Sequence, residues 1–191
     1  DHLGIVIADV SGKGVPAALF MVIAKTLIKN HAQAGATPKA VFEAVNNQLC
    51  ENNDAGMFVT SFLGILEIST GKFTYVNAGH NPPLLKRVDG EFDWLATKPG
   101  FVLAGMEDLF YQQDEIMLSR GDTLYLYTDG VTEAVNPKDE LFSEPRLLTC
   151  INQYQDVSLK EMLVGLKCDI DAFADGADQF DDITMLAVRI N

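Results

Sequence analysis

Short apolar runs separated by turn residues extend along most of the chain, and their lengths distinguish strands from helices. Residues 3–9 form a run rich in branched side chains, which is typical of a buried strand. A glycine-bearing turn at 11–14 follows, and Pro16 stands where the first turn of a helix accepts proline. The next stretch is apolar on most sides, which predicts a helix that ends near residue 34 and packs against a sheet.

A second helix and three hairpins are predicted next. Thr37 and Pro38 supply an N-cap and a first-turn residue for a helix over 39–52, whose apolar positions recur at helical spacing. Strand-like runs then occur in pairs around short turns that contain glycine. The predicted hairpins join 57–69 to 72–79, 84–88 to 91–95, and 115–119 to 123–128.

The last part of the chain reads as helical before a closing strand. Ser143 heads a short helix, and Ser158 with Glu161 forms a capping box for a longer one. A strand at 183–190 ends the chain. Antiparallel strands in the middle with helices outside predict an α+β fold, and the absence of a repeat or linker predicts a single domain over 1–191.

Composition narrows the classes of function. Of 191 residues, 48% are hydrophobic and 21% charged, which is enough for a sizeable core. The formal net charge of −13 disfavours binding to nucleic acid. Cys50, Cys150 and Cys168 lack a CxxC spacing, which indicates buried thiols in a reducing, cytoplasmic compartment rather than disulfides or zinc ligands. The sequence shows neither a signal peptide nor an apolar run of about 18 residues that would span a membrane.

Three short acidic motifs carry the candidate chemistry. They are ADVSGKG at 8–14, YTDGVTEA at 127–134 and QFDDITML at 179–186. Each places aspartate directly beside an apolar strand-like run, and these residues are Asp9, Asp129, Asp181 and Asp182. Carboxylates brought together at strand ends suit Mg²⁺ and Mn²⁺, and two such ions can share a water. The joint pattern predicts a metal-dependent hydrolytic site.

Taken singly, each acidic residue also has a structural interpretation. Asp9 could cap the helix after the turn, Asp129 could be a turn residue before Gly130, and Asp181 and Asp182 could belong to a solvated loop. The repetition of the same arrangement at three places favours the metal site.

Five ordered segments resemble the metal-dependent serine/threonine phosphatases of the protein phosphatase 2C class (PPM type), in their bacterial SpoIIE-type branch. The segments are ADVSGKGVPAALFM, FVTSFLGILE, NAGHNPP, LYLYTDGVTEA and FDDITML. The resemblance covers nearly the whole chain. It implies a four-layer α-β-β-α sandwich with mostly antiparallel sheets, two Mn²⁺ or Mg²⁺ ions, and attack by a metal-activated water without a phosphoenzyme.

The resemblance also implies roles for individual residues. Asp9 matches the aspartate that bridges both metals, and the backbone carbonyl of Val10 matches the accompanying ligand. Asp129 and Asp181 match the carboxylates that hold the second metal, and Asp182 is an accessory ligand or a neighbour of one. These assignments make Asp9, Asp129 and Asp181 the expected catalytic residues.

Other polar residues near these motifs have two interpretations each. Lys13 could meet the substrate phosphate, although a solvated lysine fits equally. Gly12 and Gly14 are interpreted as turn residues. A structural role is favoured for His80 in its proline-bounded loop over that of a general acid. Thr132 and Glu133 could order the loop over the site or begin a helix.

The family pattern has one element that this chain lacks. Its members carry an upstream GGDxxD-like segment with a further acidic ligand, so we expect N-terminal strands to be missing here and the chain to be the C-terminal catalytic part of a longer protein. An upstream sensor or receiver domain is then expected, and a homodimer is compatible with the apolar first helix.

The expected function is hydrolysis of phosphoserine or phosphothreonine on a regulatory protein in bacterial signal transduction. By resemblance, the substrate would be a small phosphorylated regulator such as an anti-sigma-factor antagonist. The alternative is a non-catalytic module that keeps the fold and binds a partner. A nucleotide-cleaving enzyme is less supported, because the chain has no P-loop or dinucleotide fingerprint.

Overall fold

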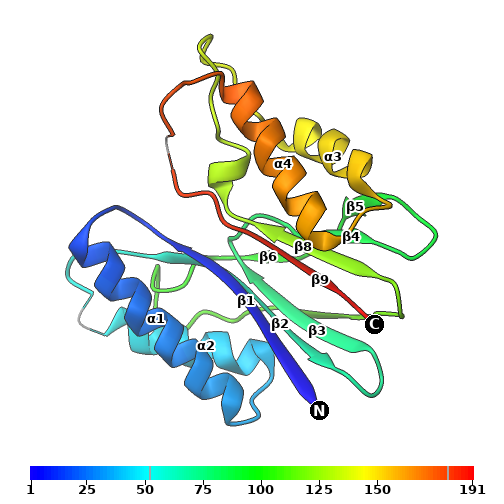
Figure 1. Ribbon diagram of the computed structural model, residues 1–191. Helices are drawn as coiled ribbons and strands as arrows, with labels where there is room; N and C mark the ends of the chain where they lie inside the picture. Colours follow the sequence, from blue (N-terminus) through cyan, green and yellow to red (C-terminus); the bar gives the residue numbers. More distant parts are fainter. Residues whose placement is uncertain (52, 180) are drawn as a thin grey trace. The chain divides into compact units, whose positions relative to one another are not determined.

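A computed structural model describes residues 1–51, 53–179 and 181–191 of the chain (Figure 1). The chain divides into two compact units. Unit 1 comprises Asp1–His80 and Ala96–Leu118, and unit 2 comprises Asn81–Leu95 and Ser119–Asn191. Each unit has its own mostly antiparallel sheet and its own pair of α-helices, which confirms the predicted α+β class.

The sheet of unit 1 is built around the first predicted hairpin. Its strands are β1 (His2–Val10), β2 (Val59–Glu67), β3 (Lys72–Ala78), β6 (Pro99–Gly100) and β7 (Gln113–Met117). The order is β1-β2-β3-β6, and β7 also pairs with β3. Only the short β3–β6 pair is parallel. The β1–β2 register places Asp9 opposite Thr60 near the end of β1.

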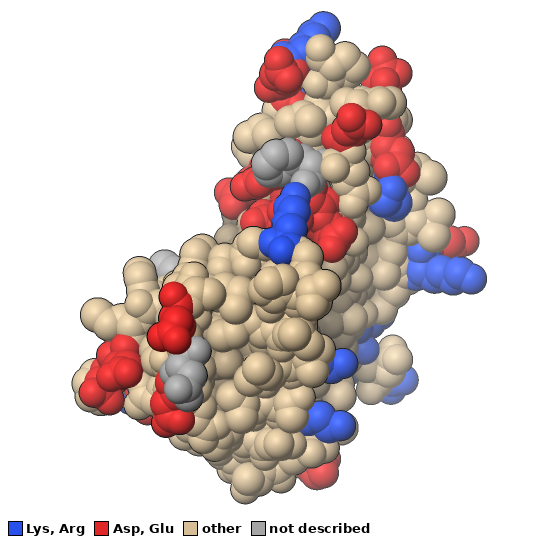
Figure 2. All heavy atoms as spheres, turned by 90° about the vertical axis from the view of Figure 1, so that its left-hand side faces the viewer, with Lys and Arg blue, Asp and Glu red and all other residues tan. Residues whose placement is uncertain are grey.

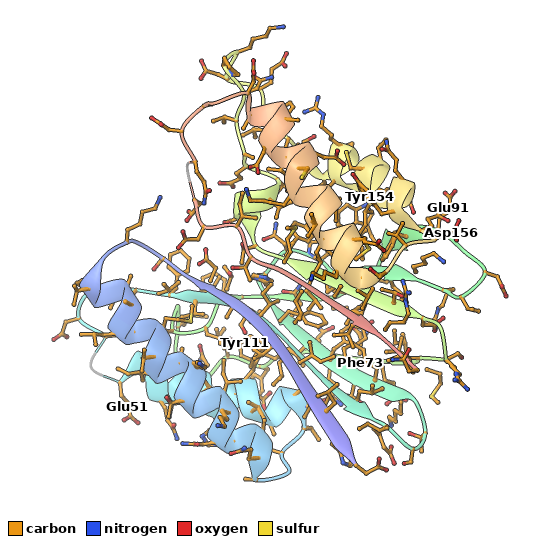
Figure 3. The ribbon with its side chains drawn as sticks, in the orientation of Figure 1. Glu51, Phe73, Glu91, Tyr111, Tyr154 and Asp156 are labelled. Atoms are coloured by element: carbon orange, nitrogen blue, oxygen red, sulfur yellow. The ribbon has the colours of Figure 1, made fainter. Side chains whose placement is uncertain are left out.

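Helices α1 (Val15–Gln33) and α2 (Pro38–Cys50) pack on one face of this sheet. Thr37 caps α2 as predicted, because its hydroxyl accepts a hydrogen bond from the backbone N–H of Ala40 at 3.3 Å. Tyr111 packs edge-on against Phe42 of α2, with ring centroids 5.7 Å apart (Figure 3). Apolar burial between α1, α2 and the sheet therefore holds unit 1 together.

The expectation that β1 is a buried strand is only partly correct, and α1, which packs against the sheet as predicted, keeps part of its apolar surface exposed. Within β1, Leu3 and Val6 are exposed because the strand lies at the sheet edge. Along α1, one stripe meets the sheet and another faces outward, in the broad uncharged area in the lower half of Figure 2. The outward residues are Val15, Leu19, Val22 and Ile23. Among the described residues, neither α1 nor another helix is long and apolar enough to cross a membrane.

The sheet of unit 2 is fully antiparallel and carries two helices of its own. Its strands are β4 (Leu84–Lys86), β5 (Phe92–Trp94), β8 (Thr123–Tyr127) and β9 (Met185–Arg189), in the order β5-β4-β8-β9. The α-helices are α3 (Glu144–Ile151) and α4 (Leu159–Ala174), and the 3₁₀ turns are η1 (Asp129–Val131) and η2 (Asn152–Tyr154). The capping box of Ser158 and Glu161 is present, as predicted. Tyr154, labelled in Figure 3, donates a hydrogen bond to Asp169 of α4 at 2.9 Å.

The third predicted hairpin is wrong. β7 pairs with β3 in unit 1, whereas β8 pairs with β4 and β9 in unit 2. The buried carboxylate of Asp122 explains the separation. It accepts hydrogen bonds from Ser119 N at 2.9 Å, Val88 N at 3.0 Å and Arg87 Nη1 at 2.7 Å. These bonds attach the segment that precedes β8 to the β4–β5 turn instead of folding it back on β7.

Removal of this carboxylate is therefore expected to destabilise unit 2. Asp122→Ala leaves two backbone donors and a guanidinium without their acceptor, and we expect a loss of roughly 3 kcal/mol in the free energy of unfolding. The measurement is urea unfolding followed by far-ultraviolet circular dichroism.

The matched control is Asp171→Ala. Asp171 pairs with Lys167 at 2.6 Å on the exposed face of α4. An exposed pair of this kind contributes less than about 0.5 kcal/mol. Equal losses for the two variants would contradict the role assigned to Asp122.

Candidate metal centre

The first acidic motif lies where β1 of unit 1 ends. Val10 N donates to the Asp9 carboxylate at Oδ1 over 3.0 Å, so the side chain is held against its own backbone. Beyond the strand, Ser11 N donates to Phe58 O and Phe58 N donates to Ser11 Oγ, each at 2.9 Å. The chain that follows Asp9 is thus held against Phe58.

The turn after this strand has the conformation that its glycines predict. Gly12 and Gly14 have φ values of 82° and 83°, a region that other residues rarely adopt. Lys13 lies exposed between them. Gly14, rather than Asp9, is the N-cap residue of α1, so the interpretation of Asp9 as a helix cap is wrong.

A threonine and a histidine lie beside Asp9 in unit 1. Thr60 Oγ1 is 3.5 Å from the Asp9 carbonyl oxygen and 2.9 Å from His80 Nδ1. Asn77 holds the His80 backbone twice: its Nδ2 donates to His80 O at 2.8 Å, and its Oδ1 accepts from His80 N at 2.7 Å. These bonds hold the loop around His80 to the end of β3.

The second and third acidic motifs meet in unit 2, at the end of β8. Thr128 N donates to Thr184 O at 3.1 Å. The Thr128 hydroxyl donates to Asp182 O and accepts from Thr184 N, both at 3.0 Å. Asp129 follows Thr128 directly, so the structure brings the Asp129 segment and the Asp181–Asp182 segment together, although 52 positions separate Asp129 from Asp181 (181 − 129). Phe180 of the third motif lies outside the described residues.

Gly130 allows this close approach. A Cβ atom at Gly130 would lie 2.4 Å from Asp182 O and 2.8 Å from Asp182 C. Both are backbone atoms, which cannot move aside as a flexible side chain would. The requirement for glycine here is therefore one of space.

Several acidic side chains lie close together after the end of β8 in unit 2. Oδ1 of Asp129 is buried and has no hydrogen-bond partner in the described part of the chain. Glu133 belongs to the same cluster: partial desolvation, and then the negative charges of Asp129 and Asp181, raise the pKa of its carboxyl above the ordinary range. An unpaired buried carboxylate oxygen beside like charges is the arrangement that a hard cation relieves. These residues therefore fit Mg²⁺ or Mn²⁺ by donor type.

The two units carry the predicted ligands separately. Asp9 and Val10 belong to unit 1, and Asp129, Asp181 and Asp182 belong to unit 2. Within the ranges that the structure describes, no three His, Cys, Asp or Glu side chains form a metal cage by themselves. From the sequence, Glu133 was expected either to order the loop over the site or to begin a helix, and not to join the acidic cluster. Its position four residues after Asp129 in the same motif was the available signal.

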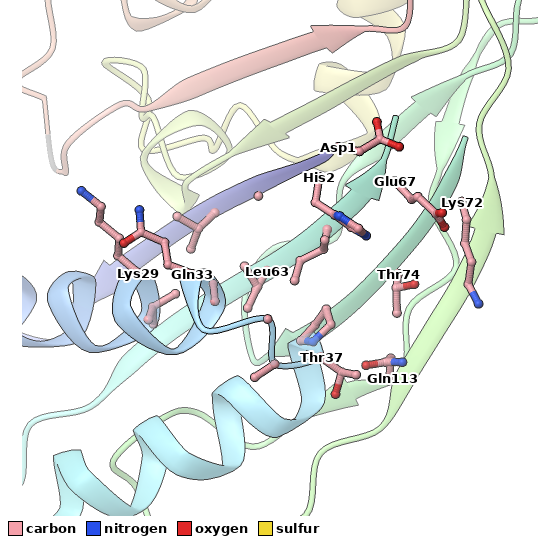
Figure 4. A pocket seen from close by; sticks show the side chains of 18 of the residues that line it. Asp1, His2, Lys29, Gln33, Thr37, Leu63, Glu67, Lys72, Thr74 and Gln113 are labelled. Atoms are coloured by element: carbon pink, nitrogen blue, oxygen red, sulfur yellow. The ribbon is translucent and has the colours of Figure 1, made fainter. Parts of the chain in front are cut away.

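A cavity of about 880 Å³ lies in unit 1, near the start of β1 (Figure 4). Leu63 lies in its wall, and Lys29, Thr37 and Lys72 line it from α1, the start of α2 and β3. The predicted site residues are not among those that line it. Its residues lie at the opposite end of β1 from Asp9, so cavity size does not locate the acidic motifs.

Comparison with known proteins supplies the family. The model of the stage II sporulation protein E (SpoIIE) family matches residues 1–191. Protein IcfG of Synechocystis is 33% identical over 219 residues, a match that covers 100% of this chain and 34% of IcfG. Phosphoserine phosphatase RsbU of Bacillus subtilis is 33% identical over 190 residues, which covers 99% of this chain and 56% of RsbU. The chain therefore spans about a third to a half of these relatives.

Solved structures have the same fold. The RsbU and RsbW domains of Rv1364c from Mycobacterium tuberculosis match with a TM-score of 0.81 and 26% identity, over 99% of this chain and 52% of that one. RsbX in complex with magnesium matches with a TM-score of 0.72 and 17% identity, over 100% and 82% of the two chains. The catalytic domain of the serine/threonine phosphatase PstP with two manganese ions matches with a TM-score of 0.70 and 15% identity, over 98% and 88%.

Because the backbone of Asp182 lies so close to Gly130, the addition of one methyl group at this position should lower the stability of the protein. Gly130→Ala must push the turn away from Asp182, and we expect a loss of about 1–3 kcal/mol in stability. Urea unfolding followed by the fluorescence of Trp94, the one tryptophan of the chain, measures it. Gly4→Ala is the control, because no atom lies within 4 Å of its Cβ position. Similar losses for both variants would show that the approach to Asp182 is unimportant.

The raised pKa of Glu133 predicts a pH-dependent effect on the metal-free protein. A carboxyl whose pKa is higher in the folded than in the unfolded state destabilises the fold once it ionises. Glu133→Gln should therefore raise the midpoint of thermal unfolding at neutral pH, by at most about 2 °C for this exposed group. The difference should vanish below about pH 4, where the carboxyl is protonated in both states.

Thermal scans in chelator at several pH values provide this measurement. Glu91→Gln, at an exposed position on the β4–β5 turn, is the control and should leave the midpoint unchanged. A Glu133→Gln midpoint equal to or below that of the parent at neutral pH would contradict the repulsion.

Proposed function

The chain belongs to the SpoIIE family, and from this premise we propose that it is a metal-dependent protein phosphatase acting on phosphoserine or phosphothreonine. The proposal is supported by relatives such as RsbU, which is named a phosphoserine phosphatase. The single observation that carries it is the buried, unpartnered Asp129 Oδ1 beside the Asp181–Asp182 segment. We further propose that residues 1–191 act as one catalytic domain, with regulation arriving from other parts of a longer protein.

The proposed ligands come from the three acidic motifs. Asp9, the carbonyl of Val10, Asp129 and Asp181 would hold metal, with Asp182 as an accessory ligand. Two Mn²⁺ or Mg²⁺ ions are supported by the manganese and magnesium in the structures of PstP and RsbX. When bound, such ions activate water for attack on phosphorus and neutralise charge on the phosphoryl oxygens.

The chain's own residues would prepare the site for this chemistry. The hydrogen bonds of Thr128 keep Asp129 next to Asp182, and Gly130 lets the two backbones approach. Glu133 adds negative charge to the cluster, which raises its attraction for a cation. Lys13, exposed on the glycine turn, would bind the substrate phosphate from unit 1.

The proposed substrate is a phosphorylated regulatory protein, such as an anti-sigma-factor antagonist. The net charge of −13 disfavours nucleic acid, since the phosphate backbone is repelled. A single phosphorylated side chain carries far less charge, and it can be drawn in by bound cations. The cationic groups of the site, rather than the surface as a whole, would then determine binding.

Replacement of one proposed ligand provides the test. Asp129→Asn removes a negative charge while the hydrogen bonds of Thr128 keep the turn in place. We expect Mn²⁺-dependent release of phosphate from a phosphoserine peptide to fall by at least about a hundredfold. The assay uses malachite green detection with and without EDTA.

Asp93→Asn is the matched control. Asp93 is exposed on β5, and its Oδ1 accepts a hydrogen bond from Trp94 N, which asparagine preserves. It should retain the parent rate. Turnover that survives EDTA or the Asp129 change would sink the assignment. A parent without turnover that still captures a partner protein would favour the non-catalytic binding module.

A further inference from the structure

His80 is a buried loop residue whose backbone is held by two hydrogen bonds. Its side chain is only 5% exposed, and Asn77 fixes its backbone on both the N–H and the C=O side. A bridge between Ser61 and Gly79 brings the loop alongside β2. His80 is thereby placed next to Thr60, the residue opposite Asp9 in the sheet register.

Thr60 links His80 to the backbone of Asp9. A hydroxyl can donate one hydrogen bond, and the Asp9 carbonyl oxygen, 3.5 Å from Thr60 Oγ1, can only accept. When the hydroxyl donates there, its oxygen accepts over the 2.9 Å contact from the Nδ1–H tautomer of His80. The imidazole, the hydroxyl and the backbone of Asp9 then form one chain of contacts.

This chain lies on the same face of the sheet as the Asp9 side chain. Residues directly opposite in antiparallel strands point to the same face, which puts the side chains of Asp9 and Thr60 together. Ala8 and Val10 point the other way and contact the core under α1 and α2. The contact between Thr60 and the backbone of Asp9 therefore belongs to the face of the sheet that carries the Asp9 carboxylate, and not to the face that α1 and α2 cover.

We propose that His80 and Thr60 are positioning residues for the metal ligands at the end of β1. The imidazole orients the Thr60 hydroxyl, and the hydroxyl holds the Asp9–Val10 peptide, which lies between the Asp9 side chain and the Val10 carbonyl. This inference rests on the proposed function, in which these two groups bind a divalent cation. It assigns a role in metal affinity to a histidine that acts through Thr60.

Substitutions that remove or keep each hydrogen bond test the proposal. Thr60→Val preserves the branched shape and removes the hydroxyl, and His80→Leu removes the donor. Each should raise the dissociation constant for Mn²⁺ about tenfold, the usual cost of losing a group that orients a ligand. Thr60→Ser keeps the hydroxyl, and His80→Asn places an amide N–H near the Nδ1 position. Both should restore affinity to within about threefold of the parent.

The measurement is free Mn²⁺ by electron paramagnetic resonance during titration of the whole chain, with no dependence on turnover. Phosphopeptide kinetics run in parallel: at saturating Mn²⁺ the variants should regain kcat with KM unchanged. The double variant Thr60→Val/His80→Leu should lose no more affinity than either single variant, because both break the same chain.

Unit 2 offers a matched control. Thr123 has the same bonding pattern as Thr60, since its hydroxyl accepts from Arg189 Nε at 3.0 Å and donates to Gly121 O at 3.5 Å. It lies away from the acidic motifs, at the start of β8. Thr123→Val should lower stability to a similar degree and leave the affinity for Mn²⁺ unchanged.

The outcomes separate the two levels of the proposal. If the parent binds Mn²⁺ but Thr60→Val and His80→Leu bind it equally well, the pair is only structural and the inference fails alone. The inference also fails alone if the serine and asparagine variants do not recover affinity. If the parent itself neither binds Mn²⁺ nor releases phosphate, the proposed function has failed, and the inference falls with it.

Discussion

The hydroxyl of Thr128 is the contact on which the acidic cluster of unit 2 depends. Asp129, Asp181 and Glu133 repel one another electrostatically, and nothing in their own chemistry brings them together. Two hydrogen bonds through that hydroxyl and one between the backbones of Thr128 and Thr184 hold the segments in place. At about 1 kcal/mol each, they favour the close approach of the two segments, and burial of Thr128 protects them from competition with water.

A threonine hydroxyl also contacts the backbone of the acidic motif in unit 1. The hydroxyl of Thr60 donates to the backbone of Asp9, and that of Thr128 donates to the backbone of Asp182. Threonine suits both places because its branched side chain favours an extended strand while its hydroxyl reaches an adjacent chain. A neutral side chain thus helps to hold the backbone of these acidic motifs, in addition to the bonds that the carboxylates of Asp9 and Asp181 accept from the next backbone N–H.

Sequence patterns within a few residues predicted much of the fold. Contacts between residues far apart in the sequence explain where the prediction was wrong. Thr37 and the Ser158–Glu161 box marked helix starts because capping involves neighbours within three residues. The false hairpin before Thr123 arose because Arg120, Gly121 and Asp122 resemble a turn in sequence. Its strands separate because Asp122 bonds to Arg87 and Val88, more than 30 positions away, which no local pattern reveals.

For the candidate site, too, local patterns were readable in the sequence and contacts between distant residues were not. Aspartates beside apolar runs are visible in the sequence, but the contacts that make them useful are not. The sequence indicated no special role for Gly130, whereas in the structure the backbone of Asp182 leaves no space for a side chain there. His80 was interpreted as structural because prolines bound its loop, and the structure shows its backbone held by two hydrogen bonds of Asn77. The contact of its side chain with Thr60, the residue opposite Asp9, adds a role in placing a ligand that the sequence did not indicate.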